Sequence, residues 1–190
     1  MFRSTLANVL PLLLLCVLSL LFSQSALAQD ELLFTKYNIH AQGKDAINFK
    51  ASYANFTDPG AGHVIIPAGT EIQMVKHGWR GFVFTYDGGS KKVTFEYHKK
   101  RMGMSMDEYI ELITSPEPVS YSGLSKQDKK GIADGKAYKG MTRKGVMIAL
   151  GYPAVHKTPS LDSNTWTYWG NRFRTIGVDF NDQGKVATVR

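Results

Sequence analysis

The chain has 190 residues, of which 43% are hydrophobic, and its formal net charge at pH 7 is +7. This length allows one domain or two small ones. The basic excess favours contact with acidic surfaces, such as anionic lipid headgroups or cell-wall polymers. Because the sequence contains no basic motif interleaved with aromatic residues, nucleic acid is not an expected partner.

The N-terminus has the parts of a secretory signal over residues 1–28. Arg3 supplies a positive charge, residues 6–22 are almost wholly apolar, and Ala26 and Ala28 place small side chains before a cut. A retained membrane anchor is the alternative, but the apolar run is slightly shorter than the roughly 20 residues of a spanning helix. No basic stop-transfer cluster follows it. We therefore predict cleavage after Ala28 and a periplasmic or secreted protein.

Cys16 is the only cysteine of the chain. Lipid attachment there would need small residues just before it, where Leu14 and Leu15 stand, so no lipid anchor is expected. Cys16 leaves with the predicted signal. The mature chain would then have no disulfide, no thiol nucleophile and no thiolate metal site.

Residues 29–115 are predicted to form a β-rich domain that ends in a short helix. Apolar and polar residues alternate within 71–75, 81–86 and 92–97, and Gly and Pro interrupt any helical periodicity. Residues 87–90 are typical of a hairpin loop. The expected shape is a meander or a small barrel like an SH3 domain, by analogy alone.

The short helix is expected to begin after Ser105. The Ser105 hydroxyl can cap it, and Glu108 stands three residues later, as in a capping box. Pro116 then prevents the helix from continuing, because proline lacks the backbone N–H. Residues 116–124 are the predicted linker.

Residues 125–190 are predicted to form two helices followed by a three-stranded antiparallel meander. Ser125 is typical of a helix start, Thr142 can cap the next helix, and Gly151 can end it. The expected strands cover 164–169, 172–180 and 185–189.

A motif with regular order and spacing lies inside this second unit. Its residues are Gly140, Met141, Thr142, Val146, Leu150, Gly151, Pro153, Trp166, Tyr168, Phe180 and Gly184. Over roughly 125–189, the pattern resembles the SmpA/OmlA (BamE-like) family of the bacterial outer membrane. The resemblance implies an ααβββ fold related to β-lactamase inhibitor proteins, and a role in binding envelope proteins or lipids. In such a fold the motif residues turn, cap or pack the chain and touch no ligand.

These expectations combine into one fold class. The chain is predicted to be α+β, with an N-terminal β-rich SH3-like small barrel or meander and a C-terminal ααβββ BamE-like module.

The sequence offers no recognisable constellation for catalysis or metal binding. No two of its five histidines lie at i and i+4 on one predicted helix, and no cysteine of the mature chain assists them. Asp107, Glu108 and Glu111 crowd a predicted helix start, where acids favour the helix dipole. We therefore predict no catalytic residue, no cofactor and no metal site.

Two stretches could form a surface for a partner or for lipid. A basic run contains Lys99, Lys100 and Arg101, and an aromatic–arginine stretch contains Trp169, Arg172, Phe173 and Arg174. The plainer alternatives are a solvated face for the first and an interface between the two domains for the second.

The function predicted from these features is non-enzymatic. We expect an exported envelope protein that binds or scaffolds an envelope protein, an anionic lipid or a cell-wall polymer, with peripheral membrane contact. One alternative is an inhibitor of a secreted enzyme, which an exposed, aromatic-rich sheet would favour. Another is a periplasmic hydrolase, which a deep pocket holding two histidines and an acid would favour.

Overall fold

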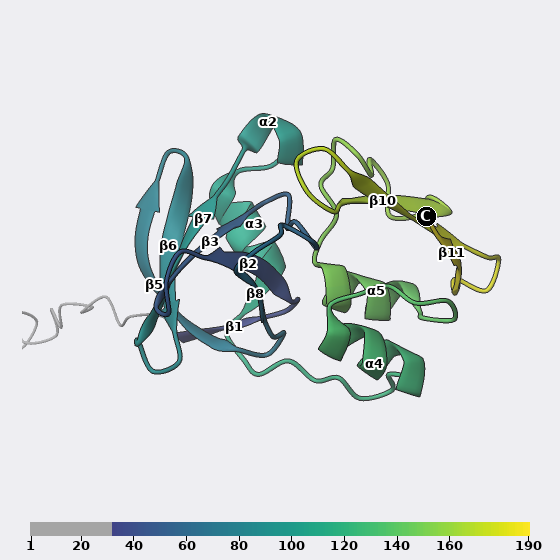
Figure 1. The fold of residues 1–190 in the computed structure, drawn as a ribbon, viewed down its shortest axis with the longest axis horizontal. Coiled ribbons are helices and arrows are strands. Elements are labelled where there is room, and N and C mark those ends of the chain that lie inside the picture. Colours follow the sequence, from purple (N-terminus) through teal and green to yellow (C-terminus); the bar gives the residue numbers. More distant parts are fainter. Residues whose placement is uncertain (1–31) are drawn as a thin grey trace, which may run out of the picture. The chain divides into compact units, whose positions relative to one another are not determined.

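The structure is a computed structural model that describes residues 32–190, so the predicted signal and its cleavage point lie outside the described residues. Residues Glu31–Arg190 group into one compact unit. The described part of this unit consists of two β-sheets and short α-helices (Figure 1). No helix within it is long and apolar enough to cross a membrane.

Eight strands form the larger sheet. They are β1 (Leu32–Thr35), β2 (Ile39–Gly43), β3 (Asn48–Ser52), β4 (His63–Ile66), β5 (Glu71–Gly78), β6 (Gly81–Tyr86), β7 (Lys91–Glu96) and β8 (Thr114–Ser115). Their order across the sheet is β4-β2-β3-β7-β6-β5-β1-β8. The antiparallel run β5–β6–β7 is joined by β3, which pairs parallel with β7. The sheet curls without closing into a barrel.

One face of this sheet carries the first hydrophobic core. Side chains alternate along β6 and β7, so that Phe82, Phe84, Val93 and Phe95 all point to the same side and are buried. The Phe82 and Phe95 rings stack with centroids 4.5 Å apart. Helix α3 (Met106–Ile113) covers this core with its apolar face.

Helix α3 begins as the sequence predicts. Ser105 accepts a hydrogen bond from the Glu108 backbone N–H, and Glu108 accepts one from the Ser105 backbone N–H. The short helix α2 (Lys99–Met102) precedes it and ends at Gly103 in the left-handed region. Residues 116–124 form neither helix nor strand.

The second core lies between two helices and the smaller sheet. The helices are α4 (Lys126–Asp134) and α5 (Arg143–Leu150), and the strands are β9 (Thr165–Trp169), β10 (Thr175–Phe180) and β11 (Val186–Val189). Val146, Leu150 and Trp166 are buried together in this core. The Trp166 and Phe180 rings meet edge to face at 4.8 Å.

Asp128 joins the beginnings of the two helices. Its buried carboxylate accepts hydrogen bonds from Ser125, which caps α4, and from the backbone N–H of Thr142, which caps α5. A Cβ on Gly145 would lie 2.0 Å from the Asp128 Oδ1 atom. Only glycine therefore allows the helices to approach this closely.

Asn38, from the larger sheet's side, binds the ends of both helices. Its backbone N–H donates to the Ile148 carbonyl at 2.8 Å. Its side-chain amide donates to Ile132 at 2.7 Å and to Ala149 at 3.2 Å, and its Oδ1 accepts from the Ala68 N–H. The last carbonyls of a helix have no i+4 partner within the helix, so Asn38 supplies hydrogen bonds that the helices themselves cannot make.

His40 and Asn55 complete this cap on α5. The His40 Nε2 atom lies 3.0 Å from the Ala149 carbonyl, and the Asn55 amide donates to the Leu150 carbonyl at 2.7 Å. Asn55 Oδ1 in turn accepts from the His40 backbone N–H at 2.8 Å. Asn55 adopts φ = 43°, a conformation that asparagine tolerates better than most residues.

The predicted fold class is wrong in both halves. The described chain is mostly β, with about 18% helix, rather than an α+β chain with an SH3-like barrel or meander and an ααβββ module. Five further strands join the predicted meander and open it into an eight-stranded mixed sheet. The C-terminal helices and strands are not a separate module, because the carbonyl end of α5 is bound by residues of the larger sheet and its loops.

Asn38 provides a test of this interlocking. Replacing Asn38 with Ala leaves the Ile132 carbonyl and the Ala68 N–H without their side-chain partner in a buried setting. We expect the free energy of unfolding to fall by about 2–4 kcal/mol, measured by urea denaturation.

The control is Gln183→Ala in an exposed turn, which is expected to change this free energy by less than about 0.5 kcal/mol. Equal stability of the two variants would show that the cap on α5 contributes little.

Candidate functional site

A cleft of about 380 Å³ lies between the larger sheet and the turn that joins β9 to β10. The side chains that point away from the first core form one wall. Lys50 and Ser52 alternate with buried Phe49 and Ala51 along β3, and Glu96 follows buried Phe95 at the end of β7. Opposite them stand Phe56, Pro59, Asn171, Arg172 and Phe173. We call this hollow the sheet–turn cleft.

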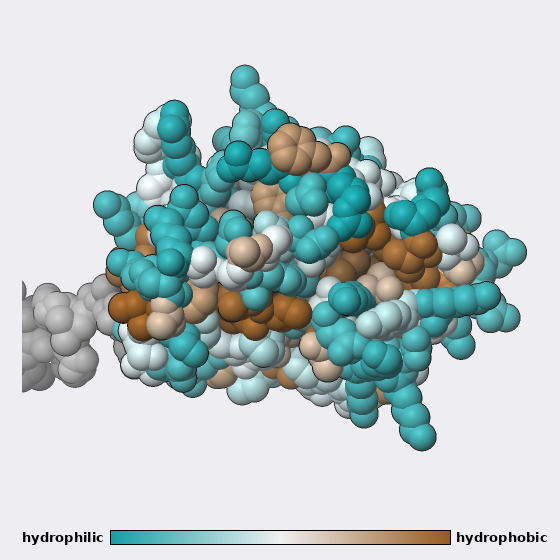
Figure 2. Space-filling model, viewed as in Figure 1, coloured by the Kyte–Doolittle hydropathy of each residue, from teal (hydrophilic) through white to brown (hydrophobic). Residues whose placement is uncertain are grey.

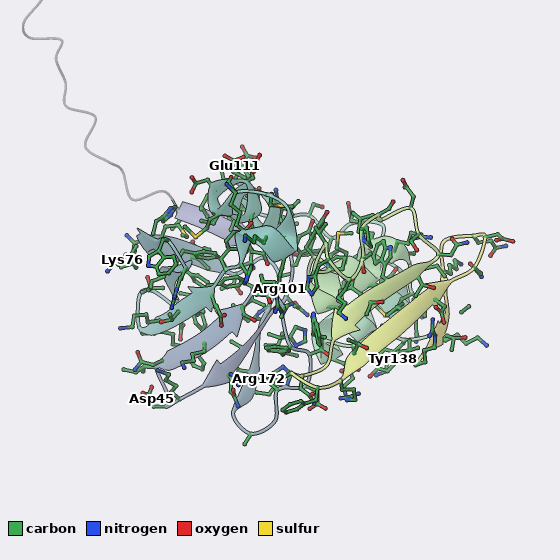
Figure 3. All side chains as sticks on the ribbon, turned by 90° about the horizontal axis from the view of Figure 1, so that it is seen from above. Asp45, Lys76, Arg101, Glu111, Tyr138 and Arg172 are labelled. Atoms are coloured by element: carbon green, nitrogen blue, oxygen red, sulfur yellow. The ribbon has the colours of Figure 1, made fainter. Side chains whose placement is uncertain are left out.

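The rim of the sheet–turn cleft is aromatic and cationic. Phe173 is 96% exposed, and Arg172 and Lys50 are exposed beside it. Figure 3 shows Arg172 at the end of the C-terminal hairpin that reaches toward the strands of the larger sheet. Among residues 32–190, Glu96 contributes the only carboxylate that lines the cleft.

Ser52 adds an unsatisfied polar atom to the wall. Its Oγ is buried, yet it has no hydrogen-bond partner in the structure. Buried polar atoms are normally paired, and those that are not need an explanation. Because this atom is closed to solvent, a ligand in the sheet–turn cleft would reach the hydroxyl only after the wall had moved.

His40 and His63 form a hydrogen-bonded pair beside the cleft. Nδ1 of His40 lies 3.0 Å from Nε2 of His63, and the rings stack with centroids 5.2 Å apart. Because a carbonyl can only accept, the His40 Nε2 that faces Ala149 carries the proton. Neutral His40 therefore accepts at Nδ1 from the His63 Nε2–H, which leaves the lone pair of His63 on its Nδ1 atom.

Burial holds the His40 ring neutral. It lowers the pKa of His40 to about 4, against a smaller opposite effect from the Ala149 carbonyl. Burial also lowers the pKa of His63, which the Asp58 carboxylate raises in part. The pair therefore has no charge at neutral pH.

A second hollow of about 520 Å³ lies on the other side of this pair, and we call it the histidine hollow. His63 and Asp58 line it together with Lys136 and Arg174. The Arg174 guanidinium donates to the Asp58 carboxylate at 2.6 Å. The charged groups here largely balance one another.

The structure separates the predicted partner residues into four settings. Arg172 and Phe173 line the sheet–turn cleft, and Arg174 is paired with Asp58. Trp169 is half-buried against the first core, with the Lys157 ammonium 4.8 Å from its ring centroid. Lys99, Lys100 and Arg101 are exposed on α2.

Arg101 connects α2 to the C-terminal elements. Its guanidinium donates to the Tyr53 hydroxyl at 2.9 Å, and its carbonyl accepts from the His156 N–H. The His156 ring stacks on Trp169. The basic run and the aromatic–arginine stretch, which are far apart in sequence, therefore contact one network.

The predicted structural residues lie in or around the second core. Met141, Val146, Leu150, Trp166, Tyr168 and Phe180 are buried members of it. Thr142 caps α5, while Gly140, Gly151 and Gly184 take positive φ. Pro153 is buried after the end of α5.

Sequence reasoning missed the other wall of the cleft and the histidine pair. Lys50, Ser52 and Glu96 share a face of two neighbouring strands, a pattern visible as alternation in the sequence. His40 and His63 have no such signal, because they meet only through the pairing of β2 with β4. Within residues 32–190, no group of three His, Cys, Asp or Glu side chains is placed to hold a metal ion.

Comparisons with known proteins add no name to this site. The chain matches no family model, no curated protein and no solved structure. The resemblance to the SmpA/OmlA family stays a prediction.

The buried histidine makes stability depend on pH. The unfolded chain binds a proton at His40 near pH 6.5, whereas the folded chain does so only near pH 4. Protons therefore favour unfolding within this window, and stability is lost as the pH falls through it. We expect a loss of about 3 kcal/mol between pH 6.5 and 4 in urea denaturation.

Replacing His40 with Gln should flatten this dependence, whatever the variant's stability at neutral pH. Exposed His98→Gln is the control and should keep the wild-type slope. An unchanged slope in His40→Gln would contradict the assignment.

Proposed function

We propose that the protein is an exported bacterial envelope protein that acts by binding rather than catalysis, with the sheet–turn cleft as its ligand site. Residues 1–28 support export, and the SmpA/OmlA resemblance supports an envelope setting. The single observation that carries the binding role is the cleft itself, which Lys50, Arg172 and Phe173 line.

The side chains around the cleft suit an acidic, hydroxyl-rich ligand. Arg172 and Lys50 can each donate charge-assisted hydrogen bonds to a carboxylate. The Glu96 carboxylate can accept hydrogen bonds from hydroxyl or amide groups of the same ligand. Phe173 and Phe56 offer apolar surface for a ring. A fragment of a cell-wall polymer that bears an acidic group combines these features, and we propose this class of ligand.

The test uses muramyl dipeptide as the probe, because it joins a sugar ring to carboxylate-bearing residues. We expect it to shift the amide NMR signals of the cleft residues. Replacing Arg172 with Ala should weaken binding about tenfold, since a hydrogen bond to a charged group contributes about 1.5–3 kcal/mol.

The matched control is Lys44→Ala, which removes an exposed cation outside the sheet–turn cleft and should leave the affinity unchanged. Titration with glycerol 3-phosphate separates a general affinity for anions from recognition of the sugar peptide. If neither probe shifts the cleft signals, the proposed ligand class is wrong.

The histidine pair favours a hydrolase as a second candidate. His63 has a lone pair on Nδ1, is oriented by His40, and lies near the Asp58 carboxylate in the histidine hollow. Such a ring can take a proton from a water molecule that attacks an ester or amide. The lining of this hollow includes Thr57 and no serine, so water rather than a serine side chain would be the nucleophile.

This candidate predicts esterase activity that depends on His63. Hydrolysis of p-nitrophenyl acetate should fall at least about 100-fold in His63→Ala, because a general base contributes roughly 10²–10⁴-fold. Exposed His77→Ala is the control and should retain the full rate. Equal rates in both variants would remove the candidate.

The inhibitor alternative finds no comparable support. The outward residues of β9 and β10 include Thr165, Thr167 and Asp179, and Trp169 on that side is half-buried against the first core. An exposed, aromatic-rich sheet, which this alternative needs, is therefore not found in the smaller sheet.

A further inference from the structure

The β5–β6 hairpin carries an exposed tryptophan at its tip. Gly78 and Gly81 form the last pair of the ladder, so the turn consists of Trp79 and Arg80 alone. Trp79 is 84% exposed, whereas Trp166 in the second core is 1% exposed. The Arg80 guanidinium lies 4.0 Å from the Trp79 ring centroid and stacks on it without burying it.

A second apolar side chain is exposed on the same hairpin. The register between β5 and β6 shifts between Met74 and Lys76, which leaves Val75 as a bulged residue. Val75 is 59% exposed. Val75 and Trp79 thus present apolar surface along a segment that projects beyond the first core.

Cations gather around this hairpin. The Tyr97 N–H donates to the Arg80 carbonyl at 2.9 Å, so the chain that leads into α2 lies beside the turn. Lys99 and Lys100 on α2 and Lys76 on the hairpin are exposed. In Figure 2, the end of the molecule that carries α2 in Figure 1 is covered mainly by hydrophilic residues.

Two acids, Asp107 and Glu108, also lie at this end. Asp107 lies 3.4 Å from His77, and Glu108 closes the capping box with Ser105. In the described part of the chain, Lys76, Arg80, Lys99 and Lys100 form no ion pair. This end of the molecule therefore combines an exposed tryptophan with four cations, which outnumber the two acids Asp107 and Glu108.

We propose that this end docks on the surface of an anionic lipid bilayer, with Trp79 at the level of the headgroups. Tryptophan prefers the membrane–water interface, where its apolar ring and its polar N–H both find partners. Lys76, Arg80, Lys99 and Lys100 then face the acidic headgroups, to which basic side chains near the surface are attracted. We call Val75, Trp79 and these four cations the docking end.

The test uses residues 29–190, because the compact unit Glu31–Arg190 contains both cores and the apolar run 6–22 would itself bind lipid. Vesicles of phosphatidylglycerol and phosphatidylcholine should sediment the protein and shift its tryptophan fluorescence to the blue. Pure phosphatidylcholine vesicles should do so far less. Raising the salt to about 1 M, where the Debye length is about 3 Å, should release it.

Two variants examine the two parts of the docking end. Trp79→Ala should weaken vesicle binding about tenfold and abolish the fluorescence shift. The double variant Lys99→Ser/Lys100→Ser should weaken it about 25-fold, since each cation near the surface accounts for about a factor of five.

Each variant has a matched control. Ile47→Ala removes an exposed apolar side chain from the β2–β3 turn, and Lys126→Ser/Lys129→Ser removes two charges from α4, drawn at the opposite side of Figure 1 from α2. Both controls should bind vesicles as the wild type does. If Trp79→Ala also binds as the wild type does, or if anionic and neutral vesicles bind equally, the proposal is overturned.

The same variants keep this proposal apart from the proposed cleft function. Arg172→Ala should weaken binding of the cleft ligand about tenfold and retain most of the vesicle binding, and Trp79→Ala should do the reverse. Loss of both properties in Trp79→Ala, with an unchanged circular dichroism spectrum, would contradict a separate docking end.

Discussion

The hydrogen bonds at the carbonyl end of α5 hold the larger sheet, the smaller sheet and the sheet–turn cleft in place. The Ala149 and Leu150 carbonyls face Asn38, His40 and Asn55, which belong to the larger sheet and its loops. Leaving one such buried group unpaired costs about 1–3 kcal/mol, so the helix and the sheet are stable only in this arrangement. The arrangement also sets where the smaller sheet lies, because α5 packs on that sheet through the second core. The wall and the turn that form the sheet–turn cleft are thereby held against each other.

The same contact determines the chemistry of the histidine pair. His40 serves as a hydrogen-bond donor to α5, and this role fixes its tautomer and, through it, the tautomer of His63. A buried ring committed to a structural hydrogen bond is a poor proton carrier, since burial keeps the pKa of His40 near 4. The pair therefore contributes a fixed, neutral group to the cleft and a lone pair to the histidine hollow. Any proton transfer by the pair would therefore take place at His63 and not at His40.

Short sequence patterns predicted the local structure, but they could not predict contacts between residues that are far apart in the sequence. The capping residues Ser105, Ser125 and Thr142 act within three residues of their partners, so their pattern sufficed. Asn38 donates hydrogen bonds to Ile132 on α4 and to Ala149 on α5, which are 94 and 111 residues away in the sequence. No periodic pattern in the sequence indicates these contacts. The parallel pairing of β3 with β7 joins Asn48 to Lys92 and also has no local signal, which is why a meander or a small barrel was expected instead. For the site, Arg172 and Phe173 stood out by composition, while Lys50 and Ser52 form a surface only because the β9–β10 turn lies opposite them. The sequence did offer a signal for Trp79, an aromatic residue in a two-residue turn between glycines.

The register of the larger sheet relates the two proposed surfaces. Glu96 pairs with Ser52 on one side and with Gly81 on the other. The wall of the cleft and the base of the Trp79 hairpin therefore lie at the same end of three neighbouring strands, β3, β7 and β6. A ligand that enters the sheet–turn cleft past Arg172 therefore arrives near the end that we propose to dock on lipid. A protein held there would meet ligands at the bilayer surface first. Docking would thus raise the local concentration of surface-bound ligands without any change in the cleft, because confinement to a surface acts as a second binding contact.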